Sequence, residues 1–152
     1  MDVPAGFRKL DLPTNAFMNA NGPVFVRMDG EQLVLGLRIE ERHCNSNRMC
    51  HGGMLLTLAD LVLTIGVNVQ AKLSRFLPTV SVTCDFIGTA PLGAWIEARI
   101  TVLRTTRNLS FAQGLLTLED GTAVARLSGI MKVGSQADPK YGPERYLGKP
   151  ED

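Results

Sequence analysis

The chain has 152 residues, of which 45% are hydrophobic and 20% are charged, and its formal net charge is +1. This length and composition are typical of a single folded domain with a sizeable core. The nearly balanced charge excludes the broad electrostatic field with which many proteins bind nucleic acid. We therefore expect a small folded protein that has no nucleic-acid partner.

Two features of the chain bear on its compartment. Residues 1–12 lack the charged start, apolar run and cleavage site of a secretory signal peptide, and three cysteines are too few for a disulfide framework. Both features favour a reducing, cytoplasmic location. Residues 52–71 are apolar enough to resemble a membrane span, but an aspartate at the centre, Asp60, costs about 2.5–3.5 kcal/mol there. We interpret this stretch as a buried helix and expect no membrane partner.

The first predicted elements lie before residue 42. Residues 1–20 carry only a weak signal for a short surface helix and are interpreted as an N-terminal extension. A short strand over 24–28 leads through the turn Asp29-Gly30 into a longer strand over 32–41. The longer strand has alternating apolar residues on one face, namely Leu33, Leu35, Leu37 and Ile39. These two strands are expected to be antiparallel neighbours.

A long helix is predicted over 53–70. It has no broad charged face, so it needs cover on nearly all sides. Its polar residues are spaced by three, four and four positions and form one narrow stripe, made of Thr57, Asp60, Thr64 and Asn68. A solvated helix face normally carries Lys, Glu or Arg, and this stripe carries none. We expect it to face a confined polar space or another subunit.

Four strands with alternating apolar residues follow the helix, over 79–87, 95–104, 108–118 and 122–134. Turn sequences at 91–93 and 119–121 make neighbouring strands antiparallel. Strands separated by one helix, without βαβ alternation, predict an α+β domain. A curved antiparallel sheet wrapped around one long central helix, the hotdog arrangement, covers that apolar helix. The single domain spans 1–134, and the polar segment 135–152 is expected to be a flexible tail.

The segment His51-Gly52-Gly53 lies where extended chain gives way to the helix. Backbone N–H groups in a first helical turn have no partner inside the helix, and glycine leaves them open to a ligand. With the helix dipole they suit a carbonyl oxygen that becomes negative during a reaction. A plain loop-to-helix junction explains Gly52-Gly53 equally well.

A distance argument links this segment to Asp60. Asp60 lies eight residues beyond Gly52, which is about 12 Å along a helix axis. A catalytic group must come within about 3 Å of its reacting atom. One helix therefore cannot supply both groups, and the sequence predicts a homodimer in which each site combines Gly52 of one subunit with Asp60 of the other.

The string HCNSNRMCHGGMLLTLAD, residues 43–60, resembles the PaaI-type hotdog-fold acyl-CoA thioesterases. In that pattern an asparagine precedes HGG by six residues, and a leucine and an aspartate follow within the helix; the likeness in strand order extends over 24–134. The resemblance implies hydrolysis of an acyl- or aryl-CoA thioester to acid and CoA, without a cofactor or metal, by a homodimer or homotetramer. It implies that Asp60 acts as general base or nucleophile and that Gly53 or Gly52 polarises the carbonyl.

The same resemblance implies roles for further residues. His51 supports the HGG loop, Asn45 positions the water or the carbonyl, and Ser81 contacts the nucleophile on the Asp60 side. The residues implied to contact CoA, chiefly its phosphates, are Arg107, Asn108, Arg104 and Arg75. The family usually has glycine where this chain has Arg48. Either the loop takes another conformation, or Arg48 contacts the substrate or a phosphate.

Other interpretations of these residues stay open. Four potential zinc ligands lie close together in the sequence, but at an uncommon spacing for structural zinc, namely His43, Cys44, Cys50 and His51. Cys50 beside His51 is a second candidate nucleophile, although adjacent side chains point in different directions. A hotdog dehydratase or hydratase and a non-catalytic acyl-CoA-binding protein are the alternative functions. The acyl specificity does not follow from the sequence.

Overall fold

The structure is a computed structural model that describes residues 2–13 and 15–147. Its strands are β1 (Arg8–Lys9), β2 (Phe25–Asp29), β3 (Gln32–Arg38), β4 (Thr79–Phe86), β5 (Trp95–Thr105), β6 (Leu109–Leu118) and β7 (Ala123–Lys132). Its helices are α1 (Ala16–Asn21), α2 (Gly52–Gln70) and α3 (Pro143–Leu147), with short 3-10 turns η1 (Glu41–His43) and η2 (Pro139–Tyr141). The predicted order of two strands, one long helix and four strands is confirmed, and each end of the chain adds short elements.

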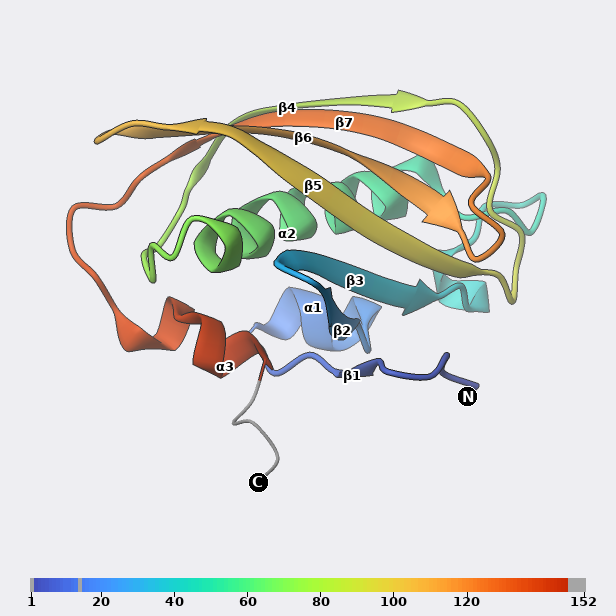
Figure 1. Cartoon of the computed structure of the whole chain (residues 1–152). Helices are drawn as coiled ribbons and strands as arrows, with labels where there is room; N and C mark the ends of the chain where they lie inside the picture. Colours follow the sequence, from blue (N-terminus) through green and yellow to red (C-terminus); the bar gives the residue numbers. More distant parts are fainter. Residues whose placement is uncertain (1, 14, 148–152) are drawn as a thin grey trace.

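The seven strands form one antiparallel sheet in the order β1-β2-β3-β5-β6-β7-β4. The sheet curves around α2, which lies against its inner face (Figure 1). This arrangement confirms the predicted α+β hotdog fold. Within the described residues β4 pairs with β7 alone, so β4 forms one edge of the sheet directly beside α2.

The apolar surface of α2 is covered by the sheet. Leu58, Val62 and Leu63 are fully buried, and each such side chain contributes about 1.5–3 kcal/mol to stability on burial. The packing is close: a Cβ placed on Gly129 of β7 would lie 2.6 Å from a methyl carbon of Leu63. By length and composition α2 is apolar enough to cross a membrane, but its burial here agrees with the predicted core helix.

The two ends of the chain pack together below α2. Met18 of α1 and Tyr146 of α3 are both buried in the core, and Arg145 forms a salt bridge of 3.2 Å with Asp11 of the N-terminal segment. Two short elements, η2 and α3, thus lie within the segment 135–152 that was expected to be a flexible tail, and its flexibility stays a prediction. The segment is polar in composition, but two of its tyrosines, Tyr141 and Tyr146, pack on the hydrophobic core. Residues 148–152 lie outside the described residues.

Candidate functional site

The chain enters α2 through a tight loop, residues 44–50. The Asn45 side chain shapes this loop, because its Oδ1 accepts hydrogen bonds from the backbone N–H groups of Asn47 (3.0 Å) and Met49 (3.2 Å). Asn45 is thus an organiser of the turn that precedes the helix. Its implied contact with a water or a carbonyl stays a prediction.

Arg48 occupies the left-handed region of backbone space in this loop, with φ at 58°. Glycine enters that region at little cost, whereas other residues do so rarely. The loop therefore has a backbone conformation that suits the glycine expected here, and an arginine adopts it. This favours a role for the exposed Arg48 side chain over a rearranged loop, and a contact of Arg48 with substrate stays a prediction.

The histidine before α2 caps the helix. His51 Nδ1 accepts a hydrogen bond of 2.9 Å from the N–H of Gly53, and the His51 carbonyl accepts from Met54 (2.8 Å) and Leu55 (3.1 Å). These hydrogen bonds are the contacts through which His51 would support the HGG loop. Of the two glycine N–H groups, the one on Gly52 has no hydrogen-bond partner among the described residues, so it is the one free to receive a carbonyl oxygen.

The ring of Phe86, at the end of β4, lies close to Gly52. A Cβ placed on Gly52 would stand 3.3 Å from the tip of that ring. A side chain at Gly52 therefore requires the exposed Phe86 ring to move by a few tenths of an ångström. The beginning of β4, at Thr79, lies instead beside Asp60, which is eight residues beyond Gly52 in the sequence.

Asp60 is partly buried, and its carboxylate is held by one hydroxyl. Thr79 Oγ1 donates a hydrogen bond of 2.6 Å to Asp60 Oδ1. The contact implied for Ser81 is thus made by Thr79, and the hydroxyl of the exposed Ser81 makes no hydrogen bond within the described residues. Strand geometry gives the reason. Val82 and Cys84 pack toward the core, so Ser81 points to the opposite face, and the β4–β7 register shifts between Thr79 and Ser81.

The polar stripe of α2 lines one side of an open cavity of about 400 Å³ whose other lining residues are mainly apolar. Two stripe hydroxyls bond to helix carbonyls: Thr57 to Gly53 at 2.8 Å, and Thr64 to Asp60 at 3.2 Å. The Asn68 amide bonds both backbone groups of Arg75, at 2.9 and 2.8 Å. Asp60 Oδ2 has no partner within the described part of the chain, so this oxygen is free to accept a proton.

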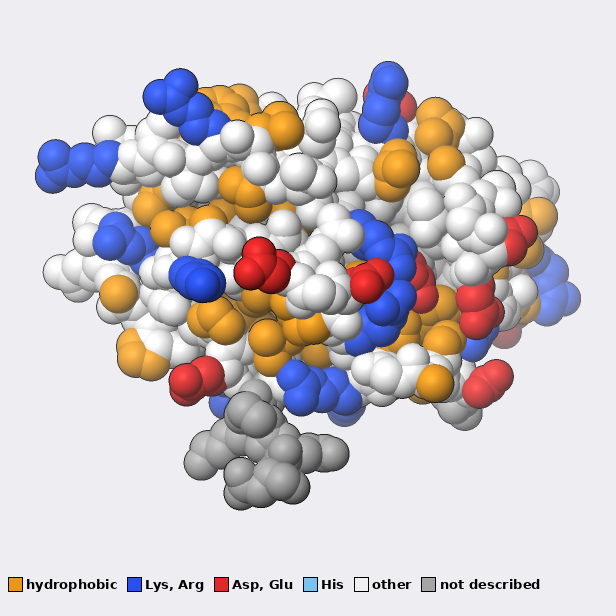
Figure 2. All heavy atoms as spheres, in the orientation of Figure 1, with side chains coloured by type: hydrophobic (Ala, Val, Ile, Leu, Met, Phe, Trp, Pro, Cys, Tyr) orange, Lys and Arg blue, Asp and Glu red, His pale blue; other side chains and the backbone are white. Residues whose placement is uncertain are grey.

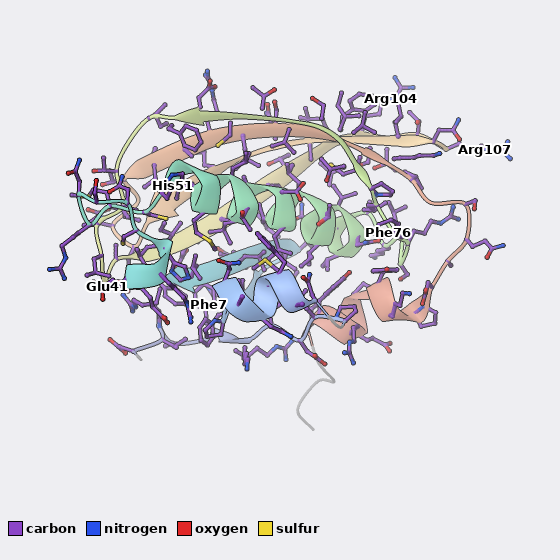
Figure 3. All side chains as sticks on the ribbon, turned by 180° about the vertical axis from the view of Figure 1, so that it is seen from behind. Phe7, Glu41, His51, Phe76, Arg104 and Arg107 are labelled. Atoms are coloured by element: carbon purple, nitrogen blue, oxygen red, sulfur yellow. The ribbon has the colours of Figure 1, made fainter. Side chains whose placement is uncertain are left out.

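Other walls of the cavity come from the two chain ends and from the segment between α2 and β4, which sequence reasoning did not include in the site. Their apolar and aromatic members are Leu12, Phe17, Phe76, Leu77, Tyr141 and Tyr146. Figure 3 looks onto α2 from this side, with α1 and α3 below it and Phe76 near its C-terminal end. The available signal was the pair of tyrosines, which are unusual in an otherwise polar tail.

The residues implied to contact CoA do not converge within one chain. Figure 3 places Arg104 and Arg107 at the β5–β6 end of the molecule and His51 at the opposite end, and Figure 2 shows Lys and Arg side chains at that β5–β6 end. Both arginines are exposed, and so is Asn108 in the same turn. The guanidinium of Arg75 donates to the Gly134 carbonyl at 2.8 Å, which gives it a structural partner. Arg48 lies in the loop beside His51.

The alternative chemistry around His43 and Cys50 has little support. Glu40 N–H donates to His43 Nδ1 (3.0 Å), and His43 Nε2 lies 2.8 Å from the Asn21 carbonyl, so the ring is engaged on both sides. Residues 2–13 and 15–147 contain no cluster of three or more potential metal ligands. Burial raises the pKa of the Cys50 thiol to about 12, with the nearby Cys44 adding to the rise. A thiol with such a pKa is a poor nucleophile at neutral pH.

Comparisons with known proteins agree with this geometry. The model of the thioesterase superfamily matches residues 47–125. A Pseudomonas aeruginosa protein named as a presumed esterase is 36% identical over 131 residues, which are 86% of this chain and 96% of that protein. Acyl-coenzyme A thioesterase 13 of Mus musculus is 30% identical over 89 residues, which are 57% of this chain and 61% of that protein.

Solved structures show the same architecture. Zebra fish thioesterase superfamily member 2 is 25% identical with a TM-score of 0.72, over 80% of this chain and 88% of that one. The Escherichia coli PaaI protein of the phenylacetic acid degradation operon is 21% identical with a TM-score of 0.71, over 81% of this chain and 87% of that one. The fold predicted from the sequence is thus shared with these proteins.

Proposed function

This chain belongs to the thioesterase superfamily and is a thioester hydrolase, and on that basis we propose that it hydrolyses acyl-CoA thioesters with Asp60 as the catalytic carboxylate. One observation carries the assignment. Asp60 is the charged residue of the cavity, one of its oxygens is held by Thr79 and the other is free. The acyl-CoA part of the proposal is supported by the name of the mouse relative.

The chemistry follows from the groups present. As general base, Asp60 Oδ2 removes a proton from water while the water oxygen attacks the thioester carbonyl carbon. The carbonyl electrons move to its oxygen, and the free N–H of Gly52 and the helix dipole stabilise that negative charge. Collapse re-forms the carbonyl and breaks the C–S bond, and the CoA sulfur takes up the proton. As nucleophile, Asp60 instead attacks the carbonyl carbon, the C–S bond breaks, and CoA leaves as its thiolate, which takes up a proton. Water then hydrolyses the resulting anhydride to the free acid and the Asp60 carboxylate.

The edge strand β4 supports a homodimer with shared sites. Apolar side chains are exposed along and just beyond it, with Val80 at 60%, Phe86 at 53% and Ile87 at 56%. An exposed apolar edge strand is a template for pairing with another strand. Antiparallel pairing of two β4 strands about their midpoints sets Thr79 opposite the partner subunit's Phe86.

That pairing also completes the catalytic site. Thr79 holds Asp60, and the ring of Phe86 lies against Gly52. Opposing these two ends of β4 therefore sets Asp60 beside the partner subunit's Gly52, which one helix cannot do by itself. The same two-fold symmetry brings the partner subunit's Arg48 toward the end that carries Arg104 and Arg107, where exposed guanidinium groups suit CoA phosphates.

The first experiment is Asp60→Asn, assayed by release of free thiol from a panel of acyl-CoAs. We expect kcat to fall by about 10²-fold or more with an unchanged melting temperature. The matched control is Glu31→Gln, which removes an exposed carboxylate in the β2–β3 turn and is expected to keep wild-type turnover. Loss of water from a 3-hydroxyacyl-CoA without thiol release supports a dehydratase, and binding without turnover supports a non-catalytic binder; either result contradicts the proposal.

The shared site is tested by complementation between two inactive subunits. Gly52→Pro removes the free N–H at the first helical position, where proline is tolerated. Gly52→Ala is the control for this variant, because it adds a side chain but keeps the N–H. Mixed dimers of Asp60→Asn and Gly52→Pro subunits contain one intact site. Because about half of randomly formed dimers are mixed, co-refolding should restore about one quarter of wild-type activity. No recovery in mixed dimers confirmed by tagging would contradict the shared site.

A further inference from the structure

We propose that Tyr146 makes the cavity selective for medium-length acyl groups that carry a hydroxyl or oxo oxygen away from the thioester. The inference rests on the proposed function, since it assigns the acyl group to the cavity beside Asp60. It concerns the part of the cavity wall that the chain ends form, rather than the part formed by the helix and sheet.

Tyr146 is a buried polar residue whose hydroxyl has no hydrogen-bond partner within residues 2–13 and 15–147. The residue is only 4% exposed and belongs to the core, and it lines the cavity together with Asp60. Its hydroxyl makes no hydrogen bond with any described residue, although that oxygen is not fully enclosed. Buried polar groups in folded proteins are almost always hydrogen-bonded. A phenol left without a partner in a cavity wall is therefore a place where a ligand or water supplies one.

The other polar groups of the α2 stripe already have partners. The hydroxyls of Thr57 and Thr64 bond to helix carbonyls, and Asn68 bonds the backbone of Arg75. Tyr146 is more deeply buried than Tyr141, the other tyrosine of the cavity wall, and no described residue bonds its hydroxyl, so we assign it to the acyl group. Burial raises the pKa of Tyr146 to about 12, with the neighbouring Tyr141 adding to the rise. The neutral phenol both donates and accepts, which suits a hydroxyl or an oxo oxygen.

The remaining surface and the size of the cavity set the rest of the acyl group. The cavity lining includes aliphatic side chains from the helix and from the segments around it, namely Leu12, Leu61, Ile65 and Leu77. The volume of about 400 Å³ holds roughly ten groups the size of a water molecule, at ~30 Å³ each with some space unfilled. A methylene group has a similar size. An acetyl group leaves most of this space empty, whereas a chain of about eight carbons occupies it.

Tyr146 is held firmly enough to act as a selectivity element. Its ring is packed in the hydrophobic core, and the exposed salt bridge between Arg145 and Asp11 adds a weak contact between α3 and the N-terminal segment. The rings of Tyr141 and Phe76 lie 5.6 Å apart, which ties the segment before α3 to the loop after α2. A site preorganised to bond a substrate oxygen discriminates strongly against an analogue that lacks it, because the polar group of the protein is then left unpaired.

The test compares hydrolysis of octanoyl-CoA with that of octanoyl-CoAs carrying a hydroxyl or an oxo group near the chain end. In the wild type we expect kcat/KM to be at least about tenfold higher for the oxygenated substrates. Tyr146→Phe should abolish this ratio, because kcat/KM for the oxygenated substrates falls to the value for octanoyl-CoA in the same variant. Thr64→Val is the matched control, because it deletes a cavity hydroxyl that already has partners, and it should preserve the ratio.

Failure of the inference and failure of the proposed function give different results. Wild-type hydrolysis without a preference, or an equal loss on both substrates in Tyr146→Phe, overturns the selectivity alone. Absence of thiol release from every acyl-CoA overturns the function. Calorimetric binding of octanoate and terminally hydroxylated octanoate to the wild type does not depend on turnover or on folding of a variant. Tighter binding of the hydroxylated acid supports the cavity assignment, and equal or weaker binding overturns it.

Discussion

The hydrogen bond from Thr79 to Asp60 predicts a specific loss of turnover in Thr79→Val. Valine keeps the branched shape of threonine and removes only the hydroxyl whose Oγ1 stands 2.6 Å from Asp60 Oδ1. A hydrogen bond to a charged group contributes about 1.5–3 kcal/mol, and about 1.4 kcal/mol corresponds to a factor of ten. If the bond orients the free carboxylate oxygen toward its water, kcat falls by about ten- to a hundredfold. KM should change little, because the orientation matters in the transition state rather than in binding.

Ser81→Ala supplies the control and the decisive contrast. The family resemblance implies that Ser81 supports the carboxylate, whereas the structure leaves its hydroxyl exposed and gives the contact to Thr79. Steady-state thiol release from both variants, with melting temperatures recorded in parallel, separates the two assignments. Wild-type kinetics in Thr79→Val together with a large loss in Ser81→Ala would refute the geometry described for Asp60.

Two further predictions concern stability. Arg48→Gly should raise the free energy of unfolding by up to about 1–2 kcal/mol, because it relieves the positive φ of Arg48; an unchanged or lower midpoint in urea would contradict this. Desolvation lowers the pKa of buried His43 from 6.5, so the unfolded chain binds a proton that the folded chain excludes. Stability from this residue is present above pH 6.5 and is lost as pH falls through the lower folded pKa, with a slope approaching about 1.4 kcal/mol per pH unit. His43→Asn should flatten that slope in urea titrations, and an identical slope would contradict it.

The parts predicted well from the sequence are those governed by periodicity. Alternating strands and one apolar helix without a charged face specify the sheet and its central helix, and the aligned stripe of Thr57, Asp60, Thr64 and Asn68 specifies the face of that helix that lines the cavity. Both follow from which side chains must be buried together. Neither inference requires knowledge of which strands pair with each other.

The parts predicted poorly depend on details that periodicity does not encode. The hydroxyl beside Asp60 comes from Thr79 because the β4 register shifts at that point, and a one-residue shift exchanges the faces of a strand. The part of the cavity wall that the C-terminal segment forms depends on Tyr141 and Tyr146. These two residues hardly change the average composition of the segment, which is polar. Which glycine N–H is free depends on the orientation of one imidazole, that of His51.

In the proposed dimer, the exposed edge of β4 is the surface that links the oligomeric state to the catalytic site. Helix length alone required a second subunit, but it did not say which surface that subunit would cover. In the structure the two ends of β4 contact the two halves of the proposed site, Thr79 at Asp60 and Phe86 at Gly52. In the proposed dimer, antiparallel pairing of this strand would bring Asp60 of one subunit and Gly52 of the other together in both sites. A charge introduced at Val80 should accordingly lower dimer affinity and turnover together, whereas subunits that stay fully active as monomers would separate the strand edge from the catalytic site.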